Sequence, residues 1–173
     1  MTLEEAVRAY TGDLLRAAIG FGAPPDRAGE LVAATFAAYL EAQARFEGRS
    51  TLKTFLFGIL YRKALEAGRK AARELAVDPA DAAFEGRFNG WGHWARLPQG
   101  PESEAEQAET AKLLDDCLAA LPENQRAAFL MKETDGLTSE EACYALGVES
   151  THLRVLLFRA RTKLRDCLEA KWK

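Results

Sequence analysis

The sequence has few of the residues on which most catalytic and metal sites depend. Its 173 residues include two histidines and three cysteines, and no two cysteines stand in the CxxC spacing of a compact metal site. It also lacks the GxSxG, P-loop and HExxH motifs of common enzyme classes. These absences argue against an enzyme and predict neither a bound metal nor a cofactor.

Long apolar runs are absent as well. None approaches the roughly 20 residues that a membrane-spanning helix needs, and the opening residues MTLEEAVRAY lack the basic region and apolar core of a signal peptide. Both observations favour a cytoplasmic protein. The formal net charge of −3 provides no overall attraction to nucleic acid, so any nucleic-acid surface must come from local basic clusters.

The three cysteines, Cys117, Cys143 and Cys167, are far apart in the sequence, and all of them fall on apolar positions of predicted helices. A buried thiol behaves as a small apolar side chain. We therefore expect all three to be reduced and buried rather than disulfide-bonded.

Alternation of apolar and polar residues, the mark of a half-buried strand, is absent from the whole chain. Apolar residues recur instead at helical spacing. One helix is predicted from Leu3 to Ile19, a second opens at Pro25, and Ser50 or Thr51 can cap a third. The sequence therefore predicts an all-α fold.

The helical pattern fails in one central stretch, which is broken by glycine and proline and contains several aromatic residues. We predict two small helical domains, 1–76 and 109–173, joined by an irregular acidic linker over 77–108. Each domain is near the lower size for independent folding, so each core is expected to be small. Linker side chains such as Trp91 and Trp94 either dock on a partner or on the domains, or form a small satellite core.

The stretch 135–165 has the pattern of a helix-turn-helix. Thr138 and Glu141 can form a capping box at its first helix, and Gly147 supplies the left-handed residue that ends it. The second helix starts two or three residues later, with the apolar stripe Leu153, Leu156, Leu157, Ala160, Leu164 and Leu168. Its other faces carry arginines, as a helix that reads a DNA major groove requires. The alternative is an ordinary helical hairpin with solvated arginines.

This stretch, with the residues just before it, resembles region 4 of bacterial sigma factors. The landmarks are Leu121-Pro122, Gln125-Arg126, Phe129, Gly136-Leu137, Glu140-Glu141, Leu146-Gly147, Arg159-Ala160-Arg161 and Leu164-Arg165. The first half is similar to region 2, with the landmarks Glu30-Leu31-Val32, Thr35-Phe36, Phe46-Glu47-Gly48-Arg49-Ser50, Leu52-Lys53-Thr54-Phe55-Leu56, Ile59 and Arg69. Region 2, a short linker and region 4, in that order, are typical of the extracytoplasmic-function (ECF) group, and the chain is identified as a member.

The resemblance implies a transcription initiation factor that binds core RNA polymerase and directs it to specific promoters. Region 2 of such a factor captures the −10 element as single-stranded DNA, and region 4 reads the −35 duplex. An anti-sigma factor is expected to control it. Cys143 and Cys167, with Trp172 near the end, resemble a subgroup whose anti-sigma partners often bind zinc.

Three sets of candidate residues follow from this resemblance. For −10 DNA they are Phe46, Gly48, Arg49, Ser50, Thr51, Lys53, Arg62, Lys63, Arg69 and Lys70. For −35 DNA they are Ser150, Thr151, His152, Arg154, Val155, Arg159 and Arg161. For the polymerase they are Glu30, Leu31, Ala34, Thr35, Ala38 and Glu41. Phe55 and Phe57 are further candidates for stacking on bases, although Phe55 also falls on the core stripe of its helix.

The chain departs from the family's usual pattern at several positions. Ala33 and Ala34 stand where many members have Gln and Glu, and a frequent Lys-Ser-Arg run in the recognition helix is Arg-Val-Leu over 154–156. The −35 sequence that it reads is therefore expected to be unusual. Two other functions stay open: a helical DNA-binding regulator that does not engage polymerase, and an adaptor whose two domains bind only another protein.

Overall fold

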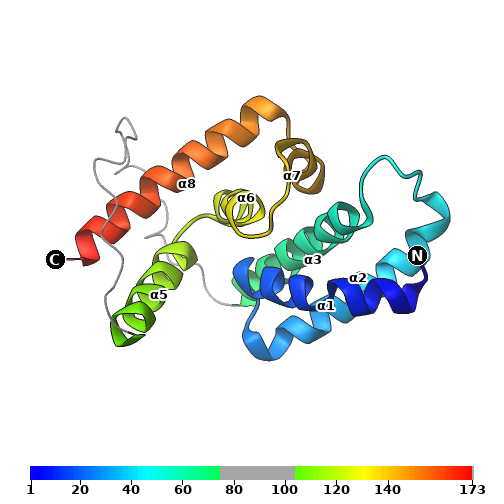
Figure 1. Cartoon of the computed structure of the whole chain (residues 1–173), viewed down its shortest axis with the longest axis horizontal. Helices are drawn as coiled ribbons and strands as arrows, with labels where there is room; N and C mark the ends of the chain where they lie inside the picture. Colours follow the sequence, from blue (N-terminus) through cyan, green and yellow to red (C-terminus); the bar gives the residue numbers. More distant parts are fainter. Residues whose placement is uncertain (75–103, 173) are drawn as a thin grey trace.

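The computed structural model describes residues 1–74 and 104–172, and it is helical, without strands, over those two ranges. This confirms the predicted all-α class. The elements, shown in Figure 1, are α1 Leu3–Gly20, α2 Pro25–Ala42, the 3₁₀ turn η1 Gln43–Arg45, α3 Leu52–Glu74, α5 Glu104–Ala119, α6 Glu123–Glu133, α7 Ser139–Leu146 and α8 Ser150–Lys171. The predicted Trp91 and Trp94 contacts lie outside the described residues.

Local sequence signals set most of the helix ends. Thr138 and Glu141 form the predicted capping box of α7, with Thr138 N donating to Glu141 Oε2 at 2.8 Å and Glu141 N to Thr138 Oγ1 at 3.2 Å. Gly147 ends α7 at φ 69°, a left-handed conformation that glycine adopts without a steric penalty. Thr51 caps α3 by accepting the Thr54 N–H at 3.2 Å.

The buried residues follow the helical spacing of apolar residues, although some apolar side chains on the same helices are exposed. The stripe of α8 is buried from Leu153 to Leu164, and Leu168 is half-buried. Val7 on α1 and Leu40 on α2 are apolar residues at helical spacing, yet they are 37% and 47% exposed. Helical spacing indicates the direction in which a side chain points, whereas burial also needs a neighbouring element in that direction.

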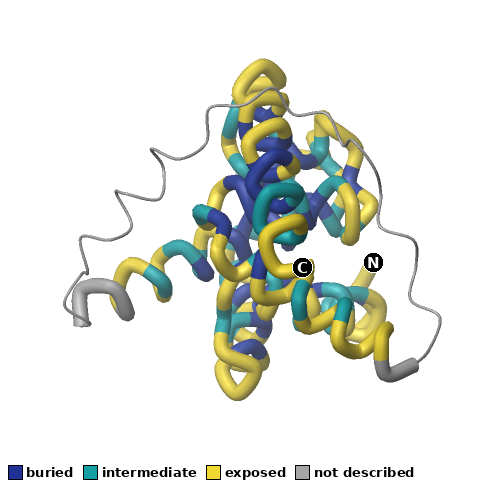
Figure 2. The backbone as a smooth tube through the Cα atoms, turned by 90° about the vertical axis from the view of Figure 1, so that its left-hand side faces the viewer, coloured by how far each residue is buried: buried dark blue, intermediate teal, exposed yellow. Residues whose placement is uncertain are grey.

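The two halves of the chain share one hydrophobic core instead of packing only within themselves. Its buried side chains come from α1, α2 and α3 and also from α6, α7 and the first turns of α8. They include Leu14, Phe57, Leu60, Met131, Leu153 and Leu156. Helix α3 packs against α7 and α1 against α6, and the buried residues run through the centre of the molecule in Figure 2.

A second, smaller cluster joins α5 to the C-terminal half of α8. Its buried residues are Cys117, Leu121, Ala160 and Leu164. Cys117 and Cys167 form a disulfide, so the expectation that all three cysteines are reduced is wrong for these two. Their Cα atoms lie 5.8 Å apart because α5 and α8 pack side by side, although 50 positions separate them in the sequence.

Candidate nucleic-acid interface

The recognition helix of the helix-turn-helix is α8, and it presents a continuous exposed face. All the residues predicted to contact −35 DNA are exposed, namely Ser150, Thr151, His152, Arg154, Val155, Arg159 and Arg161. Phe158, which was not among the candidates, is 49% exposed beside Val155 at 42%. Apolar side chains on a groove-facing helix can contact thymine methyl groups, so Phe158 belongs to this face.

Arg161 has a partner within the protein. Its Nη2 donates to Glu133 Oε1 at 2.6 Å, which links α8 to the end of α6. Both side chains are 45% exposed, so the pair contributes little to stability in water. The structure therefore gives Arg161 a second role, in joining two helices, besides the predicted contact with DNA.

The candidate −10 loop lies between η1 and α3. Phe46 is half-buried and its ring centroid lies 4.9 Å from that of Phe55, which itself packs against Tyr39 at 6.3 Å. This aromatic row holds one side of the loop against α2 and α3. At the tip, Gly48 adopts φ 66°, and Arg49 pairs with Glu47 at 2.5 Å with both side chains exposed.

The remaining −10 candidates extend along α3. Arg62, Arg69 and Lys70 are exposed and Lys63 is half-buried, which suits contacts with a DNA backbone. Phe57 is fully buried, so it cannot stack on a base in this arrangement. The sequence spacing alone could not predict that Phe57 is buried, because its burial results from other helices that cover both sides of α3.

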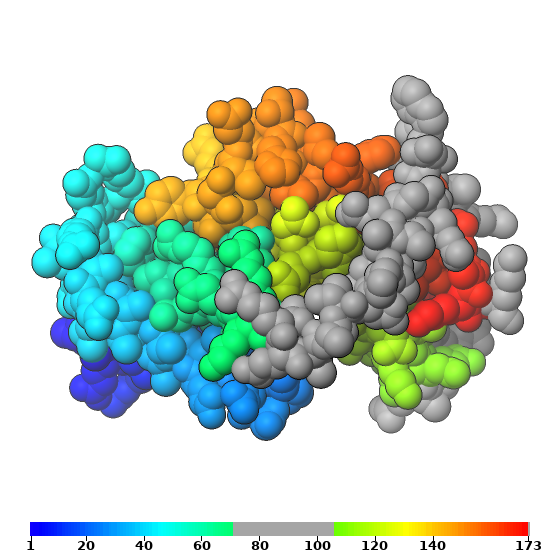
Figure 3. Space-filling view, turned by 180° about the vertical axis from the view of Figure 1, so that it is seen from behind, coloured from blue at the N-terminus to red at the C-terminus, as the bar shows by residue number. Residues whose placement is uncertain are grey.

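The structure brings the −10 loop and the helix-turn-helix together, which the sequence did not predict. Lys53 Nζ donates to the Asp135 carbonyl oxygen at 3.0 Å, and Thr51 Oγ1 lies 3.4 Å from Glu141 Oε1. In the space-filling view the first half and the helix-turn-helix form one continuous surface (Figure 3). Two candidate DNA-binding residues, Thr51 and Lys53, therefore face the other half of the chain.

The carboxyl group of Asp135 lies in this contact. Its Oδ2 is buried and has no hydrogen-bond partner among the described residues. The pKa of Asp135 is raised to about 6, chiefly by burial and also by nearby Asp13, whereas Lys53 and Arg16 oppose the change. The contact between the halves thus contains a carboxyl group that is more easily protonated than in water.

Arg126 is a functional candidate that the residue-by-residue prediction missed, although it was one of the region 4 landmarks. It is 9% exposed, and it donates from Nη2 to Phe21 O at 3.1 Å and from Nη1 to Ala119 O at 3.3 Å. Burial lowers the pKa of its guanidinium, and Glu123 opposes this. Arg126 therefore joins α6 to the end of α1, across the two halves.

The predicted polymerase-binding residues lie along α2. Glu30 and Glu41 are exposed, and Leu31, Ala34 and Ala38 are half-buried. Glu30, Leu31 and Ala34 line a cleft of about 590 Å³ whose far side is formed by residues of α3 and α6. Thr35 is a correction: it is fully buried and donates its hydroxyl to Leu31 O at 2.7 Å, so it supports α2 and offers no surface.

The described residues contain neither a metal site nor a membrane-spanning helix. No group of three or more His, Cys, Asp and Glu side chains could hold a metal ion in the ranges that the structure describes. Within the same ranges, no helix is both long and apolar enough to cross a membrane.

The second half of the chain contains a helix-turn-helix, and the first half contains a helix with exposed basic residues and an adjoining loop. These features are typical of DNA-binding proteins. Residues 6–74 match the sigma-70 region 2 family and residues 111–164 match the sigma-70 region 4 family. The chain is 32% identical over 157 residues to a Haemophilus influenzae protein named "Probable RNA polymerase sigma factor". The matched region covers 84% of this chain and 79% of that protein. The chain belongs to the sigma-70 family of RNA polymerase sigma factors.

Other similar proteins agree with the predicted ECF group. The ECF sigma factor SigD of Mycobacterium bovis is 33% identical over 122 residues, which cover 70% of this chain and 53% of SigD. The fold is similar to that of sigma factor RpoE of Bartonella quintana, solved in complex with the anti-sigma factor NepR, with a TM-score of 0.69, 23% identity and 97% of each chain covered. It is also similar to CnrH, solved with the cytosolic domain of CnrY, with a TM-score of 0.66 and 22% identity.

Proposed function

We propose that the chain is an ECF sigma factor that binds core RNA polymerase and directs it to promoters through two DNA-binding surfaces. The observation that carries this proposal is that one chain presents both surfaces within matched sigma-70 regions. These are the exposed face of α8 and the loop between η1 and α3. A DNA-binding regulator that does not engage polymerase needs no second surface of this kind.

The exposed face of α8 reads the −35 duplex under this proposal. Arg154 contacts a base edge, because a guanidinium can bond guanine at two points. Ser150 and Thr151 lie in the first turn of α8, where backbone N–H groups and the positive end of the helix favour phosphate. Arg159 lies farther along the same helix and contacts the DNA backbone.

The loop and α3 bind the −10 element as a single strand. The tip around Gly48 and Arg49 is exposed, and Phe46 closes its inner side against Phe55. Arg62, Arg69 and Lys70 supply positive charge along α3 for the phosphates. Thr51 is exposed, whereas Lys53 is half-buried and donates to the Asp135 carbonyl oxygen, so DNA can replace that contact only after the turn at Asp135 moves away from α3.

Core polymerase and an anti-sigma factor are the protein partners in this proposal. The exposed residues of α2, Glu30 and Glu41, with the half-buried Leu31, Ala34 and Ala38, offer the polymerase-binding surface. Two solved sigma factors of similar fold are bound to NepR and to the cytosolic domain of CnrY. From this similarity and from the family, we infer that an anti-sigma factor also controls this chain.

Transcription with purified core polymerase tests the proposal. Core enzyme plus the chain should start transcripts at a limited set of genomic sites, each preceded by shared −10 and −35 sequences. Core enzyme alone serves as the control. Duplex binding by the chain without any specific start would favour the DNA-binding regulator, and binding of neither DNA nor polymerase would favour the adaptor.

A further inference from the structure

Helix α5 is weakly embedded in the protein. Of its side chains from 106 to 119, Cys117 alone is buried, at 1% exposure, and Leu114 is 37% exposed. Helix α5 packs chiefly against α8. It is the first helix that the structure describes in the second half of the chain.

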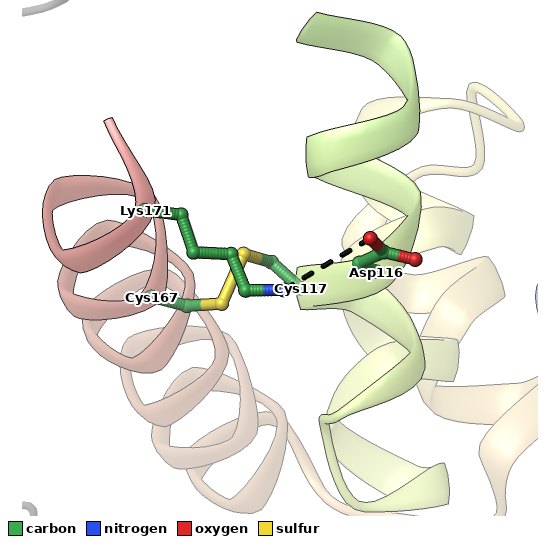
Figure 4. The surroundings of a disulfide bond; sticks show 4 residues. All are labelled: Asp116, Cys117, Cys167 and Lys171. Carbon is green, nitrogen blue, oxygen red and sulfur yellow. Dashed lines mark ion pairs between the residues drawn. A yellow bond between two sulfur atoms is a disulfide. The ribbon is translucent and has the colours of Figure 1, made fainter. Parts of the chain in front are cut away.

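The buried apolar contact between α5 and α8 is small in the part of the chain that the structure describes. The cluster that contains Cys117 has four buried residues, whereas the core shared by the two halves contains none from α5. Lys171 Nζ lies 4.0 Å from Asp116 Oδ2, which Figure 4 shows beside the disulfide, and the two side chains are 44% and 55% exposed. A solvated ion pair at this distance contributes little. The bond between Cys117 and Cys167 joins the two helices covalently across this small contact.

The two sulfur atoms differ in their surroundings. Cys117 is buried, while Cys167 is half-buried near the end of α8 and is the more accessible of the two. Cys143 lies on α7 and is a free thiol, so it is not part of this pair. Burial and the Glu140 carboxylate raise the pKa of the Cys143 thiol, which disfavours its thiolate.

We propose that Cys117 and Cys167 form a redox-operated clasp: as a disulfide they hold α5 on α8, and as thiols they release α5. This proposal rests on the proposed function in one respect only, which is the cellular compartment in which the protein acts. A sigma factor acts beside polymerase, in a cytoplasm where reductants keep thiols reduced and where a disulfide is usually transient or regulatory. The partners are thus a cellular dithiol as the reductant and a peroxide as the oxidant.

The redox steps balance. A thiolate of the dithiol attacks Cys167 Sγ, the bond between the two cysteines breaks, and Cys117 leaves as a thiolate that takes a proton. The second thiol of the reductant then displaces Cys167, which leaves as a thiolate that also takes a proton, and the reductant departs as its own disulfide. For closure, hydrogen peroxide oxidises one cysteine to a sulfenic acid and releases water. The other cysteine displaces a second water as the disulfide forms.

Hydrogen exchange of the full chain, followed by mass spectrometry, tests the clasp. Amides in α5 should exchange about tenfold faster in dithiothreitol than in the oxidised chain, because local opening no longer requires a bond to break. Exchange in α3 should not change. Hydrogen peroxide, after the dithiothreitol is removed, should restore the slow exchange in α5.

Three variants control the experiment. Cys117→Ser and Cys167→Ser should each show the fast exchange of α5 whether or not reductant is present. Cys143→Ser should respond to reductant as the unaltered chain does. Equal exchange of α5 in the oxidised and reduced chains, or three free thiols after peroxide, would overturn the clasp. Failure of promoter-directed transcription would overturn the proposed function alone, since exchange is measured without polymerase.

Discussion

Lys53 Nζ donates to the backbone carbonyl oxygen of Asp135 at 3.0 Å, which joins a candidate −10 residue to the turn that precedes the helix-turn-helix. Lys53 also lies 3.6 Å from Asp13 Oδ2, so one cation connects α3, α1 and the second half. The same contact buries apolar residues from both halves in one core. In this arrangement, residues proposed to bind DNA also hold the two halves together.

A larger side chain between α3 and α7 should favour an open form, in which the two halves of the chain have moved apart. A Cβ at Gly58 would lie 3.4 Å from Ala145 Cα, so a larger side chain has no room there. Gly58→Leu should destabilise the contact between α3 and α7 by about 1–3 kcal/mol, as overpacking of a filled core does. Small-angle X-ray scattering should show a larger radius of gyration, and binding to −10 single strands should strengthen. Gly12→Leu, on a helix position with nothing within 4 Å, is the matched control and should change neither.

The stability of the closed form, in which the two halves are in contact as in this structure, should depend on pH through the Asp135 carboxyl group. In the closed form its pKa is about 6, against an ordinary value of 3.8, so that form binds a proton more tightly than an open form with a solvated carboxyl. This contribution is fully present below about pH 4 and is lost as the pH rises through 6. The loss should amount to about 1–3 kcal/mol.

Asp135→Asn isolates this effect from the titration of other carboxyl groups. The neutral amide should raise the melting temperature at pH 7.5 and flatten the difference in stability between pH 4 and 7. The charged groups that act on Asp135 are Lys53, Asp13 and Arg16, and all three remain in the variant. A variant with the same pH profile as the unaltered chain would show that Asp135 is not the responsible group.

Arg154 should determine sequence preference at the −35 element. Arg154→Ala should weaken binding to the selected duplex by about 1–3 kcal/mol and relax the preference at one base position. Arg159→Ala should weaken binding to all duplexes to a similar extent, because a phosphate contact carries no sequence information. Fluorescence anisotropy with selected and scrambled duplexes separates the two outcomes. A uniform loss for Arg154→Ala would assign that residue to the backbone.

The disulfide should contribute measurably to stability. It closes a loop of 50 positions, for which the loss of chain entropy on cross-linking predicts about 4 kcal/mol. Urea unfolding of the oxidised chain should therefore show a higher midpoint than unfolding in dithiothreitol. Cys143→Ser should keep this difference. An unchanged midpoint would mean that α5 contributes nothing to the cooperative unit that unfolds.

Much of the local structure could be predicted because it depends on neighbouring residues. Thr138, Glu141 and Gly147 act within one turn of a helix, so their spacing is enough to predict both ends of α7. The exposed face of α8 follows in the same way from the spacing of Leu153, Leu156 and the later stripe residues. Thr35 and Phe57 could not be assigned in this manner, since their burial depends on helices elsewhere in the chain.

The helical class, the helix-turn-helix and the family could be predicted from the sequence, because periodicity, capping residues and motif landmarks depend on residues close together along the chain. Helix packing, in contrast, was needed to show that the halves share a core, that Lys53 contacts Asp135 and that Cys117 bonds to Cys167. Each of these relationships joins residues 50 or more positions apart. No local pattern encodes such a pairing, since it results from how whole helices pack to bury their apolar faces.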